Sequence, residues 1–186
     1  MYEIIPTAEK IIGQILLSEE TIAKRIKEMA NQITKDFNGE SIVAIVVMRG
    51  AFFFASDLCK QIKLPMKLDF LSASSYGDGQ ETSGKVKLAN SLREDITGKN
   101  VLIIDDMIDT GKTMKKLIDY LKAFNPKSIK LCVLCEKKSN NTEHITPDYC
   151  GFDIEDHFLI GYGLDYKGFL RNIPYIGIIN DKFKEA

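Results

Sequence analysis

The run VLIIDDMIDTGKTM at residues 101–114 joins a wholly apolar stretch to a cluster of acidic and turn-forming residues. Continuous apolar stretches of this kind are typical of strands buried on both faces of a parallel sheet. In open sheets, ligands bind beyond the carboxyl ends of such strands. We therefore expect a central strand that ends, at its aspartates, in a ligand site.

The segments around this run alternate between apolar strands and helices. Residues 18–39 predict a core helix, because Ser18 can cap it, two glutamates follow, and apolar residues recur at spacings of three and four. Further helices are expected at 51–63 and 112–124, and strands at 42–48, 66–74, 85–90, 100–106 and 128–135. The alternation predicts an α/β fold, with a mostly parallel twisted sheet flanked by helices.

The last third of the chain has a different composition, with short apolar stretches, many aromatic residues and glycines, and no amphipathic helix. We expect residues from about 146 to 186 to form a small hood together with residues 1–17, on a core of about 18–145. At 186 residues, the chain is suited to a single domain.

The composition argues against several classes of partner. Hydrophobic residues make up 45% of the chain and charged residues 27%, with a formal net charge of -1, so no basic excess points to nucleic acid. No apolar run approaches the roughly 20 residues of a membrane helix. The first residues lack a basic stretch followed by an apolar one, as a secretory signal would have. We expect a cytoplasmic globular enzyme with no membrane partner.

The cysteines and histidines form no recognisable metal or redox motif. Cys132 and Cys135 have C-x-x-C spacing, but they lie in an expected buried strand, and no second pair completes a zinc site. We interpret them as core thiols. His144 and His157 are isolated in the sequence.

The residues after the central strand can bind a phosphorylated sugar. Thr110 to Thr113 lie where a helix begins, so unpaired backbone N–H groups and two hydroxyls can bind a phosphate. Asp105 and Asp106 can accept hydrogen bonds from two vicinal hydroxyls, since carboxylates are acceptors only. Asp109 can transfer a proton at a reacting base.

Two other interpretations of this segment explain less. A P-loop would need a glycine where Asp106 stands, and a carboxylate there would face the phosphates of a nucleoside triphosphate. A solvated acidic turn that only caps the helix would leave two adjacent aspartates repelling each other at a buried strand end. A ligand with both a phosphate and a diol, or one that carries a metal ion, accounts for the whole pattern.

Several segments together resemble a known family. VLIIDDMIDTGKTM looks like the phosphoribosyl-diphosphate (PRPP) binding motif of type I phosphoribosyltransferases. The match is narrowed to the hypoxanthine-guanine phosphoribosyltransferases by VVMRGAFFFASDL (46–58), DFLSASSYGDGQETSGKVKL (69–88) and PDYCGFDIEDHFLIGYGLDYKGFLRNIPYIGII (147–179). The resemblance runs from about residue 40 to 180 and implies the type I phosphoribosyltransferase fold.

The resemblance assigns the sugar-phosphate donor to several short segments. The ribose hydroxyls would be held by Asp105 and Asp106. The 5′-phosphate would be bound by Asp109, Thr110, Gly111, Lys112 and Thr113. The diphosphate would be bound by Arg49, Gly50 and Arg171. The loop 75–84, with Ser75 and Tyr76, resembles the family's mobile lid over the reacting groups.

The purine base and the metal ion are assigned to a second group. Asp109 would be the general acid/base near purine N7. Lys137 would contact the 6-oxo group, because an ammonium donates hydrogen bonds and accepts none, which disfavours adenine. Phe158 would stack on the base, the Leu159 backbone would contact its N1/N2 edge, and Asp165 would also lie at this site. The resemblance implies Mg²⁺, carried by the diphosphate and held with help from Asp165, Asp105 and Asp106.

Three positions depart from the family pattern. Asp105 is more often glutamate, and Arg49 stands where lysine is common. The family pattern also leads us to expect a cis peptide bond between Arg49 and Gly50. Asn141 stands where some relatives have arginine, which would remove one contact with the diphosphate.

The implied reaction converts PRPP and a 6-oxopurine, hypoxanthine and also guanine, to a purine nucleoside 5′-monophosphate and diphosphate in purine salvage. The family also implies a homodimer or homotetramer. One alternative is a PRPP- or nucleotide-sensing regulator that binds RNA on the same fold, although no clustered basic face supports it. Another is a transferase that prefers xanthine, which also has a 6-oxo group.

Overall fold

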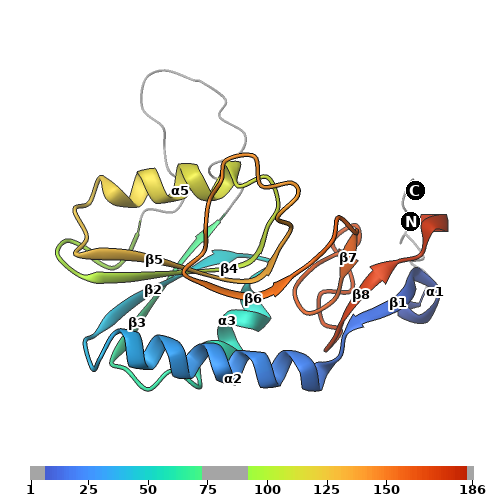
Figure 1. The fold of residues 1–186 in the computed structure, drawn as a ribbon, viewed down its shortest axis with the longest axis horizontal. Helices are drawn as coiled ribbons and strands as arrows, with labels where there is room; N and C mark the ends of the chain where they lie inside the picture. The colour runs from blue at the N-terminus through green and yellow to red at the C-terminus, as the bar shows by residue number, and fades with distance from the viewer. Residues whose placement is uncertain (1–6, 73–91, 184–186) are drawn as a thin grey trace.

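The computed structural model describes residues 7–72 and 92–183, which form a larger sheet with helices on both faces and a smaller sheet beside it (Figure 1). The helices are α1 (Ala8–Ile11), α2 (Glu19–Asp36), α3 (Phe52–Cys59) and α5 (Lys112–Lys122), with a 3-10 turn η1 (Asp181–Phe183). The strands are β1 (Ile12–Leu17), β2 (Ile42–Met48), β3 (Met66–Ser72), β4 (Asn100–Ile108), β5 (Ser128–Glu136), β6 (Tyr149–Asp153), β7 (Leu159–Ile160) and β8 (Ile176–Ile179). The expected lid, with Ser75 and Tyr76, and the expected strand 85–90 lie outside the described residues.

The larger sheet confirms the expected α/β fold. Its strand order is β3-β2-β4-β5-β6, and every neighbouring pair is parallel. β4 is central, with Val46 of β2 opposite Ile104 on one side and Val133 of β5 opposite Asp105 on the other. Because the strands are parallel, their carboxyl ends lie along one edge of the sheet. That edge brings together the chain segments after β2, β4 and β5.

Apolar side chains fill both sides of this sheet. α2 and α3 cover one face, and α5 covers the other (Figure 1). Successive strand residues face opposite ways, so Ala44 packs toward α2 and α3 while Val43 packs toward α5. Cys132 and Cys135 are buried free thiols in β5, as expected of core residues. No helix among the described residues is long and apolar enough to cross a membrane.

The longest helix begins and ends as its sequence predicts. Ser18 caps α2, and its hydroxyl oxygen accepts a hydrogen bond from the Thr21 N–H at 3.2 Å. The chain leaves the helix through Asn38 and Gly39, whose φ angles of 47° and 82° are left-handed. Elsewhere the bounds differ slightly. β4 continues past Asp106 to Ile108, and α3 is shorter than the expected 51–63.

The smaller sheet is a hood made from both ends of the chain. Its order is β1-β8-β7, and both pairs are antiparallel. The expected boundary near residue 146 does not coincide with the sheets, because β6 pairs in parallel with β5 and extends the larger sheet. β6, with the sequence YCGFD, is short and interrupted by a glycine, so it lacks the long apolar run that identifies the other core strands.

Asp69 of β3 is a buried carboxylate that holds the chain where it returns to the sheet. It is 4% exposed and accepts hydrogen bonds from the N–H groups of Phe70, Arg93 and Glu94 at 2.8, 2.7 and 2.9 Å. We expect Asp69→Ala to lower the free energy of unfolding by about 2–4 kcal/mol, since buried N–H groups lose their acceptor. Urea denaturation measures this. Asp119→Ala, on the exposed side of α5, should change it by less than about 0.5 kcal/mol, and equal losses would contradict the prediction.

Candidate active site

Two adjacent carboxyl groups, Asp105 and Asp106, lie near the carboxyl end of β4 and are largely shielded from water. Asp105 is 8% exposed, and its Oδ1 accepts a hydrogen bond from the Asp106 N–H at 2.9 Å. Asp106 Oδ1 accepts one from the Met107 N–H at 3.0 Å. Burial, and next the charge of Asp106, raise the pKa of Asp105 well above its usual value, and burial also raises the pKa of Asp106. Such a pair at a strand end marks a functional site, where ligand hydroxyls or a cation can compensate it.

Gly50, between β2 and α3, makes room for the Asp106 carboxylate. A Cβ on Gly50 would lie 1.8 Å from Asp106 Oδ2, so a side chain is excluded and the backbone of this loop lies directly against the acidic strand end. The expected position of the cis peptide bond is wrong. It lies between Met48 and Arg49, one bond earlier, at the last residue of β2. The Arg49 side chain is exposed.

The turn into α5 is suited to an anion. Gly111 precedes the helix with a φ of 82° and gives it no side-chain cap. The Lys112 N–H donates weakly to Thr110 Oγ1 at 3.5 Å, and the following N–H groups of the first turn can bind an external acceptor. The neighbouring Thr110, Lys112 and Thr113 are exposed. Asn141 closes the turn from behind, because a Cβ on Gly111 would lie 2.8 Å from Asn141 Oδ1. The residues expected at the 5′-phosphate therefore surround one open turn.

Asn141 braces the loop that follows β5. Its amide donates to Glu136 Oε1 at 3.1 Å and to the Ile145 carbonyl at 2.7 Å, and its oxygen accepts from the Ile145 N–H at 3.1 Å. These bonds fix the loop behind Gly111. Asn141 thus supports the turn into α5, a role that the sequence pattern did not predict.

Lys137 and Asp109, which follow the neighbouring strands β5 and β4, have side-chain partners in the loops after β6 and β5. Lys137 is 7% exposed, and its Nζ donates to Asp156 Oδ1 at 2.8 Å. Asn140 Nδ2 donates to Asp109 Oδ1 at 3.0 Å. Lys137, and next Asn140, hold the pKa of Asp156 below its usual value. A buried ammonium and an exposed carboxylate are thus joined through Asn140 and Asp156, neither of which was singled out from the sequence.

A turn of the hood reaches over Gly50. A Cβ on Gly163 would lie 2.0 Å from the Gly50 carbonyl oxygen. Arg171 Nη1 donates to the Gly163 carbonyl at 2.6 Å, and its Nη2 pairs with Asp165 Oδ1 at 2.6 Å. The charge of Arg171 opposes the effect of burial on the pKa of Asp106. The residues expected at the diphosphate and the metal therefore lie together beside the acidic strand end.

Phe158 and Leu159 lie where the hood begins. Phe158 is 46% exposed, and its carbonyl accepts a hydrogen bond from the Ile179 N–H at 3.0 Å. Leu159 is buried in β7, opposite Ile178 of β8. The ring of Phe158 is thus accessible to a base, and stacking on it stays a prediction.

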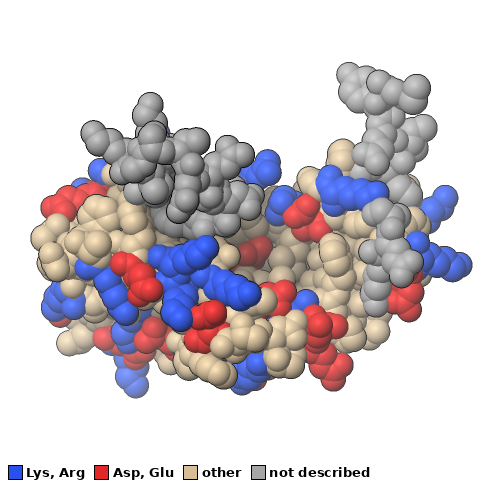
Figure 2. All heavy atoms as spheres, turned by 90° about the horizontal axis from the view of Figure 1, so that it is seen from above, with Lys and Arg blue, Asp and Glu red and all other residues tan. Residues whose placement is uncertain are grey.

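The surface of the molecule is hollowed between the core and the hood (Figure 2). Figure 2 shows acidic side chains within this hollow and basic side chains beside it. Asp105, Asp106 and Asp165 do not converge into a metal cage. Among the described residues, three metal-binding side chains converge in one group, formed by Glu136, Cys150 and Asp153. Carboxylate oxygens at the strand end still suit Mg²⁺, which keeps several waters and binds through one or two carboxylates together with substrate phosphates.

The fold and the acidic strand end define a phosphoribosyltransferase-type domain, and residues 14–167 match the phosphoribosyl transferase domain family. The chain is 42% identical over 166 residues to the hypoxanthine phosphoribosyltransferase of Buchnera aphidicola subsp. Schizaphis graminum, covering 88% of this chain and 94% of that protein. The chain belongs to the phosphoribosyltransferase family, and within it to the hypoxanthine phosphoribosyltransferases.

Solved structures agree with this assignment. A hypoxanthine phosphoribosyltransferase from Staphylococcus aureus superposes with a TM-score of 0.89 at 35% identity, covering 99% of this chain and 100% of that one. A hypoxanthine-guanine phosphoribosyltransferase from Bacillus anthracis gives a TM-score of 0.83 at 41% identity, covering 91% and 98%. The resemblance read from the sequence is confirmed.

Asp105→Asn should stabilise the fold at neutral pH. A carboxyl group whose pKa is raised by folding contributes stability below its unfolded pKa of about 3.9 and loses it as the pH rises through the folded pKa. Since folding raises the pKa of Asp105, we expect Asp105→Asn to increase the free energy of unfolding at pH 8 by about 1 kcal/mol or more. The gain should vanish below about pH 4.

Urea denaturation of the ligand-free protein at the two pH values tests this expectation. Asp109→Asn is the control, because the Asp109 side chain is exposed, so the free energy of unfolding of this variant should change by less than about 0.5 kcal/mol. A loss of stability in Asp105→Asn at pH 8, or an equal gain at both pH values, would contradict the account of the buried pair.

Proposed function

We propose that this chain transfers the phosphoribosyl group of PRPP to hypoxanthine, and also to guanine, as a single-domain enzyme of purine salvage. The observation that carries the proposal is the meeting of three features at one sheet edge. They are the buried carboxyl pair of β4, the open turn into α5 and the Gly50 loop, which is covered by Gly163, the hydrogen-bond partner of Arg171. Relatives named hypoxanthine phosphoribosyltransferase support the choice of base.

The donor sugar fits the strand end of β4. Asp105 and Asp106 would accept hydrogen bonds from the two ribose hydroxyls, which would offset the repulsion between the two carboxyl groups. The 5′-phosphate would lie against the first turn of α5, where N–H groups and the hydroxyls of Thr110 and Thr113 can donate. The diphosphate would then extend toward Gly50.

The chemical step needs charge to be stabilised at both ends of the breaking bond. As the bond between ribose C1′ and the diphosphate breaks, positive charge develops on the sugar and negative charge on the leaving group. Arg171 and the backbone N–H groups near Gly50 would stabilise the departing diphosphate. A new bond forms between C1′ and a ring nitrogen of the purine, and Asp109, near N7, would exchange the proton that the reaction displaces.

Magnesium fits this arrangement as an ion carried by the substrate. Asp165, Asp105 and Asp106 would help to hold it, and the ion would neutralise charge on the diphosphate. Both oxygens of Asp165 already have protein partners, Arg171 and the Gly168 N–H at 2.7 Å. Those contacts orient the carboxylate toward the hood turn.

Base selection would depend on Lys137. Its ammonium would donate to the purine 6-oxo group, after exchanging part of its contact with Asp156. Adenine offers a 6-amino group, which cannot accept from an ammonium without cost. Phe158 would stack on the ring, and the Leu159 backbone would contact the N1/N2 edge.

The most direct test offers each base separately. The purified protein is mixed with PRPP and Mg²⁺, and hypoxanthine, guanine, xanthine or adenine is added, with and without a chelator, while nucleotide formation is followed. We expect conversion of hypoxanthine and guanine, none of adenine, and loss of activity with the chelator. No conversion of any base, or conversion that survives removal of all divalent metal, would refute the proposal. Xanthine as the preferred base, or RNA binding without nucleotide synthesis, would favour the alternatives.

Asp109→Asn separates proton transfer from binding. We expect turnover to fall by about 100-fold or more, because amide cannot accept the proton, while PRPP affinity persists. Steady-state kinetics and calorimetry measure the two quantities. Asp119→Asn, an exposed aspartate of α5, should behave as the unaltered protein. Loss of PRPP affinity with unchanged turnover would make Asp109 a binding residue instead.

We also propose that the chain forms a homodimer or homotetramer through the free face of β3. Three large apolar side chains there, Phe52, Leu68 and Phe70, are 51%, 47% and 49% exposed and line one groove beside α3. Exposed apolar groups gathered in this way mark interaction surfaces, and a twofold axis would place two identical copies face to face.

Phe70→Glu tests this assembly. Light scattering coupled to size exclusion should give a multimer for the unaltered protein and a monomer for the variant, since a carboxylate would be buried without a partner. Phe124→Glu, at the exposed end of α5 beyond this groove, should keep the multimer. A monomeric unaltered protein would contradict the proposal.

A further inference from the structure

Tyr162 occupies a backbone conformation that disfavours a side chain. It lies between Gly161 and Gly163 in the hood turn, with a φ of 49° where these neighbours have 98° and 105°. Glycine adopts such angles without penalty, whereas a residue with a Cβ stays there only when its surroundings hold it. Contacts of the tyrosine side chain must therefore fix this turn.

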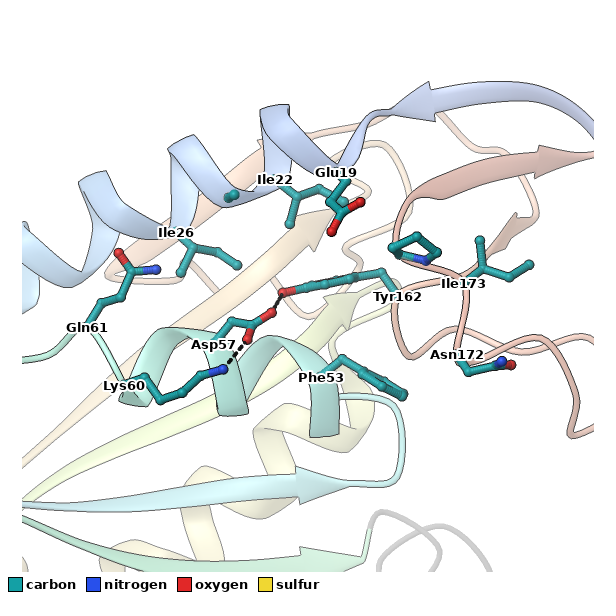
Figure 3. A pocket seen from close by; sticks show the side chains of 12 residues that line it. Glu19, Ile22, Ile26, Phe53, Asp57, Lys60, Gln61, Tyr162, Asn172 and Ile173 are labelled. Carbon is teal, nitrogen blue, oxygen red and sulfur yellow. Dashed lines mark hydrogen bonds and ion pairs between the residues drawn. The ribbon is translucent and has the colours of Figure 1, made fainter.

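The hydroxyl of Tyr162 is tied to α3. Tyr162 Oη donates to Asp57 Oδ2 at 2.6 Å, and Asp57 Oδ1 pairs with Lys60 at 2.7 Å (Figure 3). Burial, and next the hydrogen bond to Asp57, raise the pKa of Tyr162, so the hydroxyl keeps its proton and stays a donor. Although burial alone would raise the pKa of Asp57, bonds from Lys60 and Tyr162 hold it below its usual value. Donor and acceptor thus both persist at neutral pH.

Tyr162 is 7% exposed and belongs to the hydrophobic core, where its ring centroid lies 6.4 Å from that of Phe53. A cleft of about 440 Å³ lies beside the tyrosine ring, between α2, α3 and the hood. Its apolar walls include Ile22, Ile26, Phe53 and Ile173 (Figure 3). The hydrogen bond to Asp57 adds a directional contact with α3 to this apolar packing.

The turn that Tyr162 holds is the one that covers Gly50. The Tyr162 N–H donates to the Ile173 carbonyl at 2.7 Å, and the Gly163 N–H donates to the Arg171 carbonyl at 2.9 Å. Gly163 itself lies against the Gly50 carbonyl oxygen. Since α3 follows directly after the Gly50 loop, a bond from Tyr162 to α3 ties together both sides of this contact.

We propose that Tyr162, held by Asp57, is a positioning residue that keeps Arg171 and the Gly50 loop in register to bind the diphosphate of PRPP. This inference rests on the proposed function. It assigns no contact with the purine, so its effect should fall on PRPP alone.

Tyr162→Phe removes the hydroxyl and keeps the ring. We expect the Kd for PRPP with Mg²⁺, measured by calorimetry, and the KM for PRPP to rise about tenfold, as for the loss of one hydrogen bond to a charged group. The KM for hypoxanthine and kcat should stay within about twofold. Asp57→Ala should have the same effect, and the double variant should lose no more than either single one.

Tyr149→Phe is the matched control. Tyr149 is 2% exposed, and its hydroxyl also donates to an aspartate, Asp36 Oδ2, at 3.0 Å. Asp36 is the last residue of α2, so this bond does not involve α3 or the hood turn. This variant loses a buried hydroxyl of the same kind, and its PRPP affinity should stay within about twofold. A general loss of stability would lower the PRPP affinity of both tyrosine variants, whereas a positioning role of Tyr162 lowers it in Tyr162→Phe alone.

Unchanged PRPP affinity in Tyr162→Phe, or an equal loss in Tyr149→Phe, would overturn the inference. If the unaltered protein binds PRPP and makes nucleotide while Tyr162→Phe matches it, the inference alone fails. If the unaltered protein binds no PRPP, the proposed function fails, and this inference fails with it.

Discussion

The absence of a side chain at Gly50 is the constraint on which the site depends. Asp106 Oδ2 lies 1.8 Å from where a Cβ on Gly50 would be, so the carboxylate occupies that space. Gly163 of the hood lies against the carbonyl oxygen of Gly50. Segments after β2, at the end of β4 and in the hood thus meet at backbone distance. Glycine at position 50 makes room for the Asp106 carboxylate, and glycine at position 163 makes room for the Gly50 carbonyl.

The electrostatics of the site follow from that close packing. Asp105 and Asp106 are removed from water, which raises the pKa of both groups, and Arg171 partly offsets the effect on Asp106. Lys137 and Asp109 have protein partners in Asp156 and Asn140. In the proposed function, a base that contacts Lys137 and Asp109 would exchange existing contacts, whereas a sugar bound at Asp105 and Asp106 would relieve a repulsion. We therefore expect the sugar-phosphate donor to stabilise the fold more than the base does when each one binds.

Much of the fold could be predicted from long apolar runs, because β2, β4 and β5 are buried on both faces and therefore consist mainly of apolar residues. β6 escaped prediction, since five residues with a central glycine carry no such pattern. At the candidate site, the sequence pattern singled out charged residues such as Asp105, and the family resemblance added Lys137. The supporting roles of Asn141, which the sequence analysis named only as a departure from the family pattern, and of Tyr162 were not predicted, because their partners are brought close only by the folded chain.

Binding of PRPP to Gly50→Ala tests the central claim most directly. Calorimetry with Mg²⁺ should show affinity reduced by about 100-fold or more, because the added Cβ displaces the Asp106 carboxylate. Gly13→Ala, where a Cβ would meet Asn180 at 3.3 Å, should bind within about twofold of the unaltered protein. A folded Gly50→Ala variant that binds PRPP as tightly as the unaltered protein would contradict the account.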